Sequence, residues 1–384
     1  MTLPPLVGHE EIRESLRSAH LRGSLPAALA LHGPRGVGKQ RLALWLAQLL
    51  VCERGAEAPC GACASCRMAL SLEHPDVHWY FPLPRPKAAG DKLVAALEEA
   101  RLERLAELRA DPLRASYSDE LRGLYLGTVR SIRAVAHKRP VLARGPVFIV
   151  GEAELLAPQE ASQEAANALL KLLEEPPGGA RFILTSSEPG RLLPTIRSRT
   201  VPLHLAPLPR SVVASFLEEH ASAAPQAAAR AAALAHGSIG RALGFLPTEE
   251  GEGPLETLRR EALRVVLAAV GRPSDGYALA LGYPVAQART LVDLLAFVEE
   301  WLRDLAAVAA SAPDAVLHQD ARAKLEACVR DTGLAAFDLS ATFVPVERAR
   351  ELSYGNVNPQ LVVSGLVREL RALLRPRAAG SAVA

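Results

Sequence analysis

Glycine and lysine residues near the N-terminus follow the spacing of loops that bind phosphate groups. The stretch GPRGVGKQ matches the pattern G-x-x-x-x-G-K-[ST] at every position except the last. Glycines let backbone N–H groups face the phosphates, and the lysine reaches the β and γ oxygens. The pattern predicts a nucleotide site, and the alternative is a tight glycine turn that binds nothing. The residues concerned are Gly33, Gly36, Gly38, Lys39 and Gln40.

Two positions that normally hold Mg²⁺ beside such a loop carry other residues. Gln40 stands where a Ser or Thr hydroxyl ligates the ion, and an amide is a poorer ligand. After the apolar stretch VFIV, Gly151 stands where the aspartate that organises Mg²⁺ belongs. Glu152 takes the place of the carboxylate that polarises water. We therefore expect a degenerate site, at which ATP binding can survive while turnover is lost.

Four cysteines lie close together in the sequence with the spacing C-x7-C-x2-C-x2-C. Four thiolates can close a tetrahedral Zn²⁺ site, and four protein ligands leave no position for a reactive water. In a reducing compartment such a cluster favours metal over disulfides. The pattern predicts a structural zinc site, and the alternative is a set of reduced surface thiols. The predicted ligands are Cys52, Cys60, Cys63 and Cys66.

Strand and helix signals alternate through the first half of the chain. A short strand ends at Gly33 and the helix QRLALWLAQLLVC follows the loop; the strand PVFIV leads to the helix ASQEAANALLKLLEE, which Pro176 stops. The strand ARFILTSSEP comes next, and a charged helix is expected around Asp91 to Ala110. From Pro209 onward only helical patterns remain. This order predicts an α/β domain with a parallel sheet, followed by helical domains.

Charge and hydropathy exclude several classes of protein. The chain has 384 residues with 44 Lys+Arg against 42 Asp+Glu, so it is not a polycation. Any binding of nucleic acid would therefore require a local basic patch. No apolar run is long enough to span a membrane and no signal peptide is recognisable, so a cytoplasmic protein without membrane contact is expected. One patch without acids offers DNA phosphate contacts or simply a solvated face: Arg130, Arg133, Lys138 and Arg139.

Further motifs resemble one family. The phosphate loop and four-cysteine module are followed by HPD at 74–76, AANALLKLLEEPP at 165–177 and LPTIRSRT at 193–200. This combination resembles the bacterial clamp-loader subunits, the AAA+ proteins of the DNA polymerase III holoenzyme, and it covers roughly residues 5–245. The resemblance implies ATP-dependent loading of a sliding clamp onto primed DNA.

The family's architecture implies an AAA+ domain, a helical lid and a helical collar, and the stretch that opens with the Pro/Gly-rich FPLPRPKAAG indicates an insertion. An AAA+ P-loop domain with a parallel sheet is expected at 1–207, with a zinc module at 52–66 and an insertion at about 82–126. All-helical parts should follow as a lid at 208–250 and a collar, or oligomerisation domain, at 251–384.

Within the family the sequence is most similar to the delta-prime subunit, a stator whose own nucleotide site has decayed. Besides Gln40 and Gly151, Gly240 stands where the ATP-hydrolysing gamma/tau subunits carry a phosphate-sensing arginine. Arg241 lies one residue later, about 100° around a helix. The resemblance thus implies a stator with little ATPase activity of its own. Two alternatives are an active gamma/tau-type motor and an unrelated zinc-bearing nucleotide switch.

The family also implies a role for Arg199 in the segment SRT. The corresponding arginine is a finger inserted into the ATP site of the neighbouring subunit, where it stabilises transition-state charge. The simpler alternative is a solvated arginine at the start of a strand. The implied partners are gamma/tau and delta subunits in a hetero-pentamer, the sliding clamp and primer–template DNA. Polymerase activity would belong to the holoenzyme, because no acidic two-metal site is recognisable here.

Overall fold

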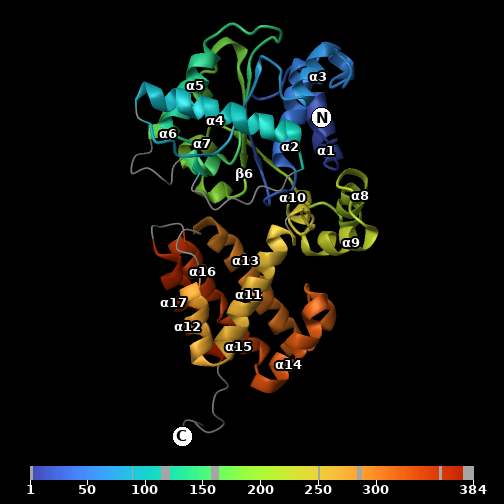
Figure 1. The fold of residues 1–384 in the computed structure, drawn as a ribbon. Coiled ribbons are helices and arrows are strands. Elements are labelled where there is room, and N and C mark those ends of the chain that lie inside the picture. Colours follow the sequence, from blue (N-terminus) through green and yellow to red (C-terminus); the bar gives the residue numbers. More distant parts are fainter. Residues whose placement is uncertain are drawn as a thin grey trace. The chain divides into compact units, whose positions relative to one another are not determined.

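The computed structural model describes residues 3–88, 90–113, 122–156, 164–249, 251–282, 288–353 and 357–374. The chain divides into two compact units, with the boundary after Leu243 (Figure 1). Every strand that the structure describes belongs to the first unit. Residues 114–121 of the expected insertion and residues 161–163 of the expected helix ASQEAANALLKLLEE lie outside the described residues.

Five parallel strands form the central sheet of the first unit, in the order β2-β5-β6-β1-β7. Those at the centre are short apolar runs, as is typical of parallel strands buried on both faces. Their bounds are β1 Ala28–His32, β2 Val77–Tyr80, β5 Val147–Val150, β6 Arg181–Ser186 and β7 Val201–His204. The sequence specified β1, β5 and β6 but gave no range for β2 and β7. These two lie at the sheet's edges, where half-exposed and polar residues weaken the strand pattern.

Neighbouring residues along each strand face opposite sides of the sheet and build two separate cores. Ile149 and Ile183 belong to one core, which also receives the apolar face of α2. Phe148 and Phe182 belong to the other and stack with ring centroids 5.1 Å apart. The helices of this unit are α1 Glu10–Leu21, α2 Lys39–Val51, α3 Ala64–Leu70, α4 Asp91–Ala110, α5 Leu126–Ala136, α6 Glu164–Glu174, α7 Pro194–Arg197, α8 Arg210–His220, α9 Pro225–Leu234 and α10 Ile239–Leu243.

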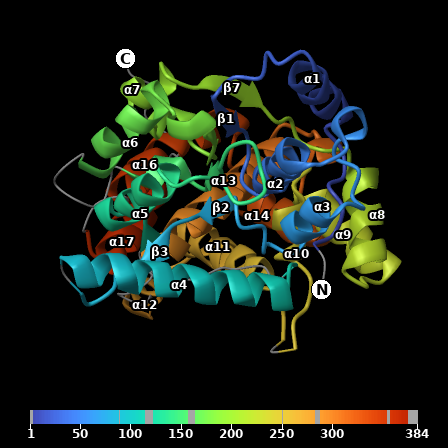
Figure 2. The ribbon, with the colours of Figure 1, turned by 90° about the horizontal axis from the view of Figure 1, so that it is seen from above.

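The expected charged helix is α4, which runs beside α5 in the first unit (Figure 2). Leu97 and Leu105 are buried in the same core as α2. The guanidinium of Arg101 donates to the carbonyl of Trp79 over 3.3 Å and lies over the ring of Tyr80. Two short antiparallel strands, β3 Leu83–Pro84 and β4 Arg122–Gly123, flank the helix in sequence. The helix is therefore an integral part of the first unit's core.

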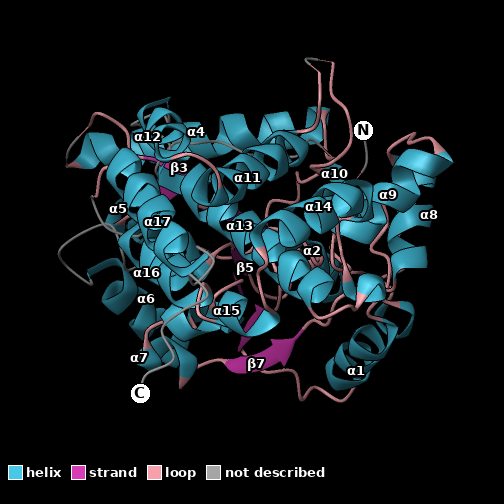
Figure 3. Ribbon diagram, turned by 90° about the horizontal axis from the view of Figure 1, so that it is seen from below, coloured by secondary structure: helices cyan, strands magenta, loops and turns pink. Residues whose placement is uncertain are grey.

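The second unit consists of helices in the part of the chain that the structure describes (Figure 3). Trp301 is buried at its centre and donates its indole N–H to the carbonyl of Arg259 over 2.9 Å. The expected fold class, a parallel α/β P-loop domain followed by all-helical parts, is thus confirmed. The helices are α11 Pro254–Val270, α12 Pro273–Gly282, α13 Ala288–Ala309, α14 Arg322–Thr332, α15 Ala336–Ser340, α16 Phe343–Ser353 and α17 Pro359–Leu374. None of the described helices is both long and apolar enough to cross a membrane.

Candidate functional site

The phosphate loop joins the end of β1 to the start of α2, as the motif requires. Gly33, Gly36 and Gly38 all have positive φ, at +149°, +74° and +111°. A Cβ at Gly33 would lie 2.3 Å from the carbonyl oxygen of Leu205. Only glycine combines these backbone angles with so close an approach. The loop therefore has the backbone of a phosphate-binding loop.

Lys39 is buried beneath the loop, with only 6% of its surface exposed. Its Nζ donates to the carbonyls of Gly33 and Pro34 over 2.8 and 2.7 Å. Burial lowers the pKa of Lys39 to about 8, although the nearby carboxylates of Glu154 and Glu152 oppose this shift. The ammonium group therefore satisfies its hydrogen bonds on the loop itself.

Gln40 and Gly151, the two departures from a magnesium site, lie next to each other. The amide nitrogen Nε2 of Gln40 is 3.1 Å from where a Cβ at Gly151 would stand. An aspartate at position 151 would therefore crowd the glutamine. The neighbouring Glu152 adopts a positive φ of 47° and donates its backbone N–H to Thr185 Oγ1 over 3.2 Å. Gln40 and Gly151 are therefore sterically compatible with each other. Neither offers the hydroxyl or carboxylate that usually binds magnesium at these positions.

A second carboxylate at this edge of the sheet, Glu154, was not predicted. It is 5% exposed, and its Oε1 accepts the backbone N–H of Ser187 over 2.9 Å. Its Oε2 is buried without a hydrogen-bond partner among the described residues. Burial raises the pKa of Glu154. The available signal was an acid a few residues beyond the buried strand β5, but only the fold reveals its proximity to Lys39.

The helix α10 packs directly on the phosphate loop. The backbone N–H of Gly240 donates to the carbonyl of Gly36 over 3.0 Å, and Ser238 Oγ donates to the carbonyl of Arg35 over 2.8 Å. A Cβ at Gly240 would lie 2.8 Å from the Cα of Gly36, so this arrangement has no room for a side chain there. Arg241 donates from Nε to the carbonyl of Leu234 over 3.2 Å. Position 240, where the resemblance predicts that a motor subunit would carry an arginine, is thus in a close contact that favours glycine.

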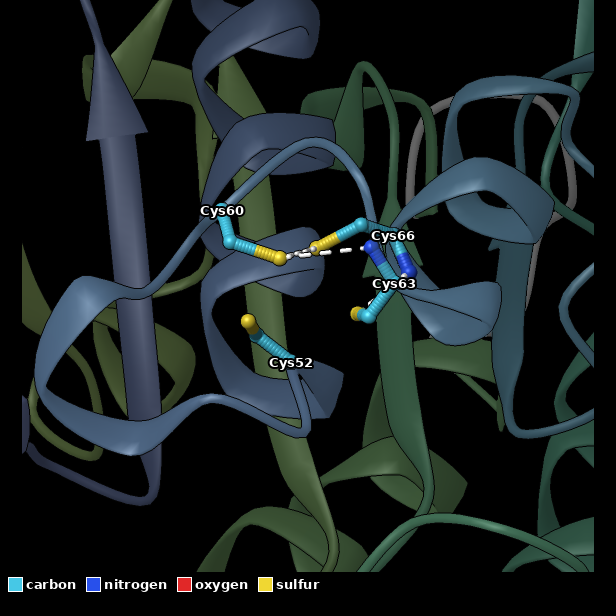
Figure 4. Close-up of side chains that lie close together, drawn as sticks. All are labelled: Cys52, Cys60, Cys63 and Cys66. Atoms are coloured by element: carbon cyan, nitrogen blue, oxygen red, sulfur yellow. Dashed lines mark hydrogen bonds between the residues drawn. The ribbon is translucent and has the colours of Figure 1, made fainter.

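The four predicted cysteines converge at the other end of α2 (Figure 4). Their Sγ atoms all lie within 4.8 Å of one another. Zinc–sulfur bonds of about 2.3 Å in a tetrahedron place sulfurs roughly 3.8 Å apart, so the cluster is of the right size. The backbone N–H groups of Cys63 and Cys66 point at Cys60 Sγ and Cys63 Sγ over 3.3 and 3.4 Å. The cluster can therefore hold a metal ion.

Backbone hydrogen bonds favour the thiolate form of Cys60, which is the form that binds a metal cation. The N–H groups of Ala62 and Cys63 lower the pKa of the Cys60 thiol to about 6, whereas burial raises the pKa of Cys66. A bound cation would offset that cost of burying negative charge. The thirteen residues of α2 span about 20 Å, so this centre is separate from the phosphate loop.

Arg199 lies just after α7, on the surface of the first unit. Its Nε donates to Glu174 Oε1 over 2.6 Å, and its Nη2 forms an ion pair with the same oxygen. Its Nη1 donates to the carbonyl of Thr195 over 3.0 Å. About a third of the side chain, 33%, is exposed. The predicted finger is therefore partly accessible, and its guanidinium contacts residues of α6 and α7.

The predicted DNA-binding residues lie on α5 and the turn after it, and all are exposed: Arg130, Arg133, Lys138 and Arg139. Asp76 of the HPD motif holds the next part of this segment, because its carboxylate accepts the N–H groups of residues 141, 142 and 143, each over 2.7 Å. Burial alone would raise the pKa of Asp76, but these hydrogen bonds outweigh it and hold the pKa below its usual value. The sequence contained the motif without revealing this anchoring role.

Comparison with known proteins places the chain among subunits of DNA polymerase III. Residues 8–209 match the family described as "DNA polymerase III, delta subunit". The chain is 30% identical to DNA polymerase III subunit delta' of Escherichia coli K12, over 72% of this chain and 70% of that protein. It is 38% identical to the delta' subunit of Pseudomonas aeruginosa, over 53% of this chain and 49% of that protein.

A tau subunit is similar as well. DNA polymerase III subunit tau of Escherichia coli K12 is 29% identical over 73% of this chain, which spans only 37% of the length of that protein. Similarity therefore does not by itself separate the delta' type from the tau type. The family match covers more than half of the chain. The chain belongs to the family of AAA+ clamp-loader subunits of DNA polymerase III.

Proposed function

We propose that this protein is the delta-prime-like stator of its clamp loader. It would assist ATP-dependent loading of the sliding clamp onto primed DNA without being one of the motors. The observation that carries the proposal is the paired loss at the nucleotide site. Gln40 occupies space beside Gly151, and Gly240 packs on Gly36 where a sensor arginine would be needed. Each departure from an ATPase is matched by a contact that suits the residue present.

Nucleotide binding at this loop would use the groups that remain. The loop N–H groups and Lys39 would hold the phosphates, and Lys39 would first have to leave the carbonyls of Gly33 and Pro34. A magnesium ion normally neutralises charge on the γ-phosphate, and Gln40 and Gly151 offer it poor support. We therefore assign the site weak ATP binding at most and no significant turnover.

We assign the cysteine cluster to a structural zinc ion. Cys52, Cys60, Cys63 and Cys66 supply four sulfurs, which leaves no open coordination position for catalysis. The ion would tie the end of α2 to the start of α3. Its contribution is therefore to stability.

Arg199 would act on a neighbouring subunit rather than on this one. An arginine that reaches a neighbour's γ-phosphate is worth about 10³–10⁵ in rate in comparable systems. The exposed position of Arg199 supports this role. The proposed partners are gamma/tau-type motors and a delta-type subunit in a hetero-pentamer, together with the clamp. Sequence-independent contacts to primer–template phosphates fall to the exposed side chains Arg130, Arg133, Lys138 and Arg139.

ATP hydrolysis tests this assignment. We expect no turnover by the isolated chain above that of its Lys39→Ala variant. In a complex with gamma/tau and delta subunits of the same organism, Arg199→Ala should lower turnover while Arg197→Ala, a change of an exposed arginine two residues earlier, should not.

The second candidate is an active motor subunit of the gamma/tau type. The intact backbone of the glycine loop and the presence of Lys39 and Glu152 favour it. Steady turnover by the isolated chain that Lys39→Ala abolishes would establish the motor and overturn the stator.

A further inference from the structure

We propose that Glu174 is the positioning residue of the arginine finger. It would hold the guanidinium of Arg199 in the orientation that a neighbouring subunit's phosphate requires. This inference rests on the proposed role of Arg199 and adds a second residue, from a different helix, to the same function.

Glu174 reaches Arg199 because two helices end at the same place. It is the last residue of α6, which stops ahead of Pro176. Arg199 follows α7 and is 25 residues away in sequence, yet its Nε donates to Glu174 Oε1 over 2.6 Å. Because the two side chains come from separate elements, their pairing fixes the finger relative to the body of the domain.

The contacts of Arg199 involve all three nitrogens of its guanidinium. Nε and Nη2 face Glu174, and Nη1 donates to Thr195. The remaining contact, from Nη1 to Ser198 Oγ, is long at 3.4 Å. Arginine has five N–H groups in a rigid plane, so one on Nη2 stays available, and release of the long contact to Ser198 would free one on Nη1 for a bidentate contact with phosphate.

Charge and flexibility explain why the carboxylate is useful. A free arginine side chain loses considerable rotamer entropy when it is fixed, and prior orientation reduces that loss in the transition state. A glutamate at the C-terminal end of a helix faces the negative end of the helix dipole, so Glu174 gains from a cation beside it. Among the described residues, the adjacent Glu175 forms no such ion pair and is also exposed, which makes it a matched control.

The experiment measures ATP turnover of the complete reconstituted complex with clamp and primed DNA, for Arg199→Ala, Glu174→Ala, Glu175→Ala and the double variant Glu174→Ala/Arg199→Ala. We expect Glu174→Ala to cause at least half of the loss in kcat that Arg199→Ala causes, with KM for ATP unchanged. The double variant should be no slower than Arg199→Ala alone, because Glu174 acts only through the arginine. Glu174→Gln keeps an acceptor oxygen and should fall between wild type and Glu174→Ala.

The outcomes distinguish the role of Arg199 from that of Glu174. If Arg199→Ala leaves turnover unchanged, the finger itself is refuted. If Arg199→Ala is slow but Glu174→Ala matches Glu175→Ala, the finger stands and the positioning role of Glu174 is wrong. Additive losses in the double variant would also overturn it. Thermal unfolding and assembly of each variant serve as controls, and Glu174→Gln replaces Glu174→Ala if the alanine variant fails to fold.

Discussion

The two ends of helix α2 each carry groups that the sequence predicts to hold a ligand, but the two sets of groups differ in their hydrogen-bond partners. At the N-terminal end, Lys39 bonds to loop carbonyls and Gly240 packs on Gly36. At the C-terminal end, four sulfurs converge within 4.8 Å of one another. At the first end the lysine is bonded to carbonyls of the chain itself, whereas at the second end backbone N–H groups and neighbouring thiols surround the sulfurs and a cation would balance their charge. The comparison teaches that ligand-like spacing in a sequence does not reveal whether the protein has already filled the site.

The largest effect should come from disrupting the cysteine cluster. Cys60→Ser/Cys66→Ser should abolish stoichiometric zinc and destabilise the protein by about 4 kcal/mol or more, as is typical when a structural metal is lost. The midpoint of thermal unfolding should then lie roughly 8–16 °C lower. Zinc content and the unfolding midpoint measure both effects. Cys328→Ser, outside the cluster, should retain the ion; a double variant with unchanged content and midpoint would show that the cluster is no metal site.

The second-largest effect is the pH dependence of stability that arises from Lys39, at the N-terminal end of α2. The pKa of Lys39 is about 8 in the folded protein and near 10.5 in the unfolded chain, so between these values the unfolded state binds more protons. The free energy of unfolding should therefore rise with pH from 8 to 10.5, by about 2–3 kcal/mol from this group. Denaturation of wild type and Lys39→Met across this range tests it. Lys171→Met, at an exposed site, should leave the slope unchanged, and equal slopes for all three proteins would refute the prediction.

A smaller loss of stability is expected when the contact between α10 and the phosphate loop is disturbed. Gly240→Ala places a Cβ 2.8 Å from the Cα of Gly36, and relief of that crowding should cost about 2 kcal/mol. Chemical denaturation measures the change. Gly190→Ala is the control, because its Cβ would meet no atom within 4 Å. Equal stability of the two variants would mean that the packing of α10 on the loop adds little.

The smallest effect should appear when the magnesium ligands are restored. Gln40→Thr/Gly151→Asp should strengthen Mg²⁺-dependent ATP binding about tenfold, or about 1.4 kcal/mol, as measured by calorimetry. Gly151→Asp alone should gain less, because its Cβ would stand 3.1 Å from the amide nitrogen of Gln40. Equal gains from Gly151→Asp and from the double variant would show that replacing Gln40 contributes nothing.

Local patterns were enough to predict much of the fold. Apolar runs marked β1, β5 and β6, and the charged helix at Asp91–Ala110 has the predicted bounds. The edge strands β2 and β7 were not predicted because their half-exposed and polar residues weaken the apolar strand pattern. The roles of Glu154 and Asp76 were not predicted either, because they depend on the groups that surround each carboxylate and not on sequence spacing.

The sequence by itself determined the loop, the cysteine cluster and the family, because each depends on residue types at short, fixed spacings. Only the tertiary structure decided how these parts are satisfied. It placed Gln40 against Gly151, Gly240 on Gly36 and Glu174 beside Arg199, pairs separated by between 25 and about 200 residues. Such contacts arise when the sheet and its helices close around a common core, and no local pattern specifies them.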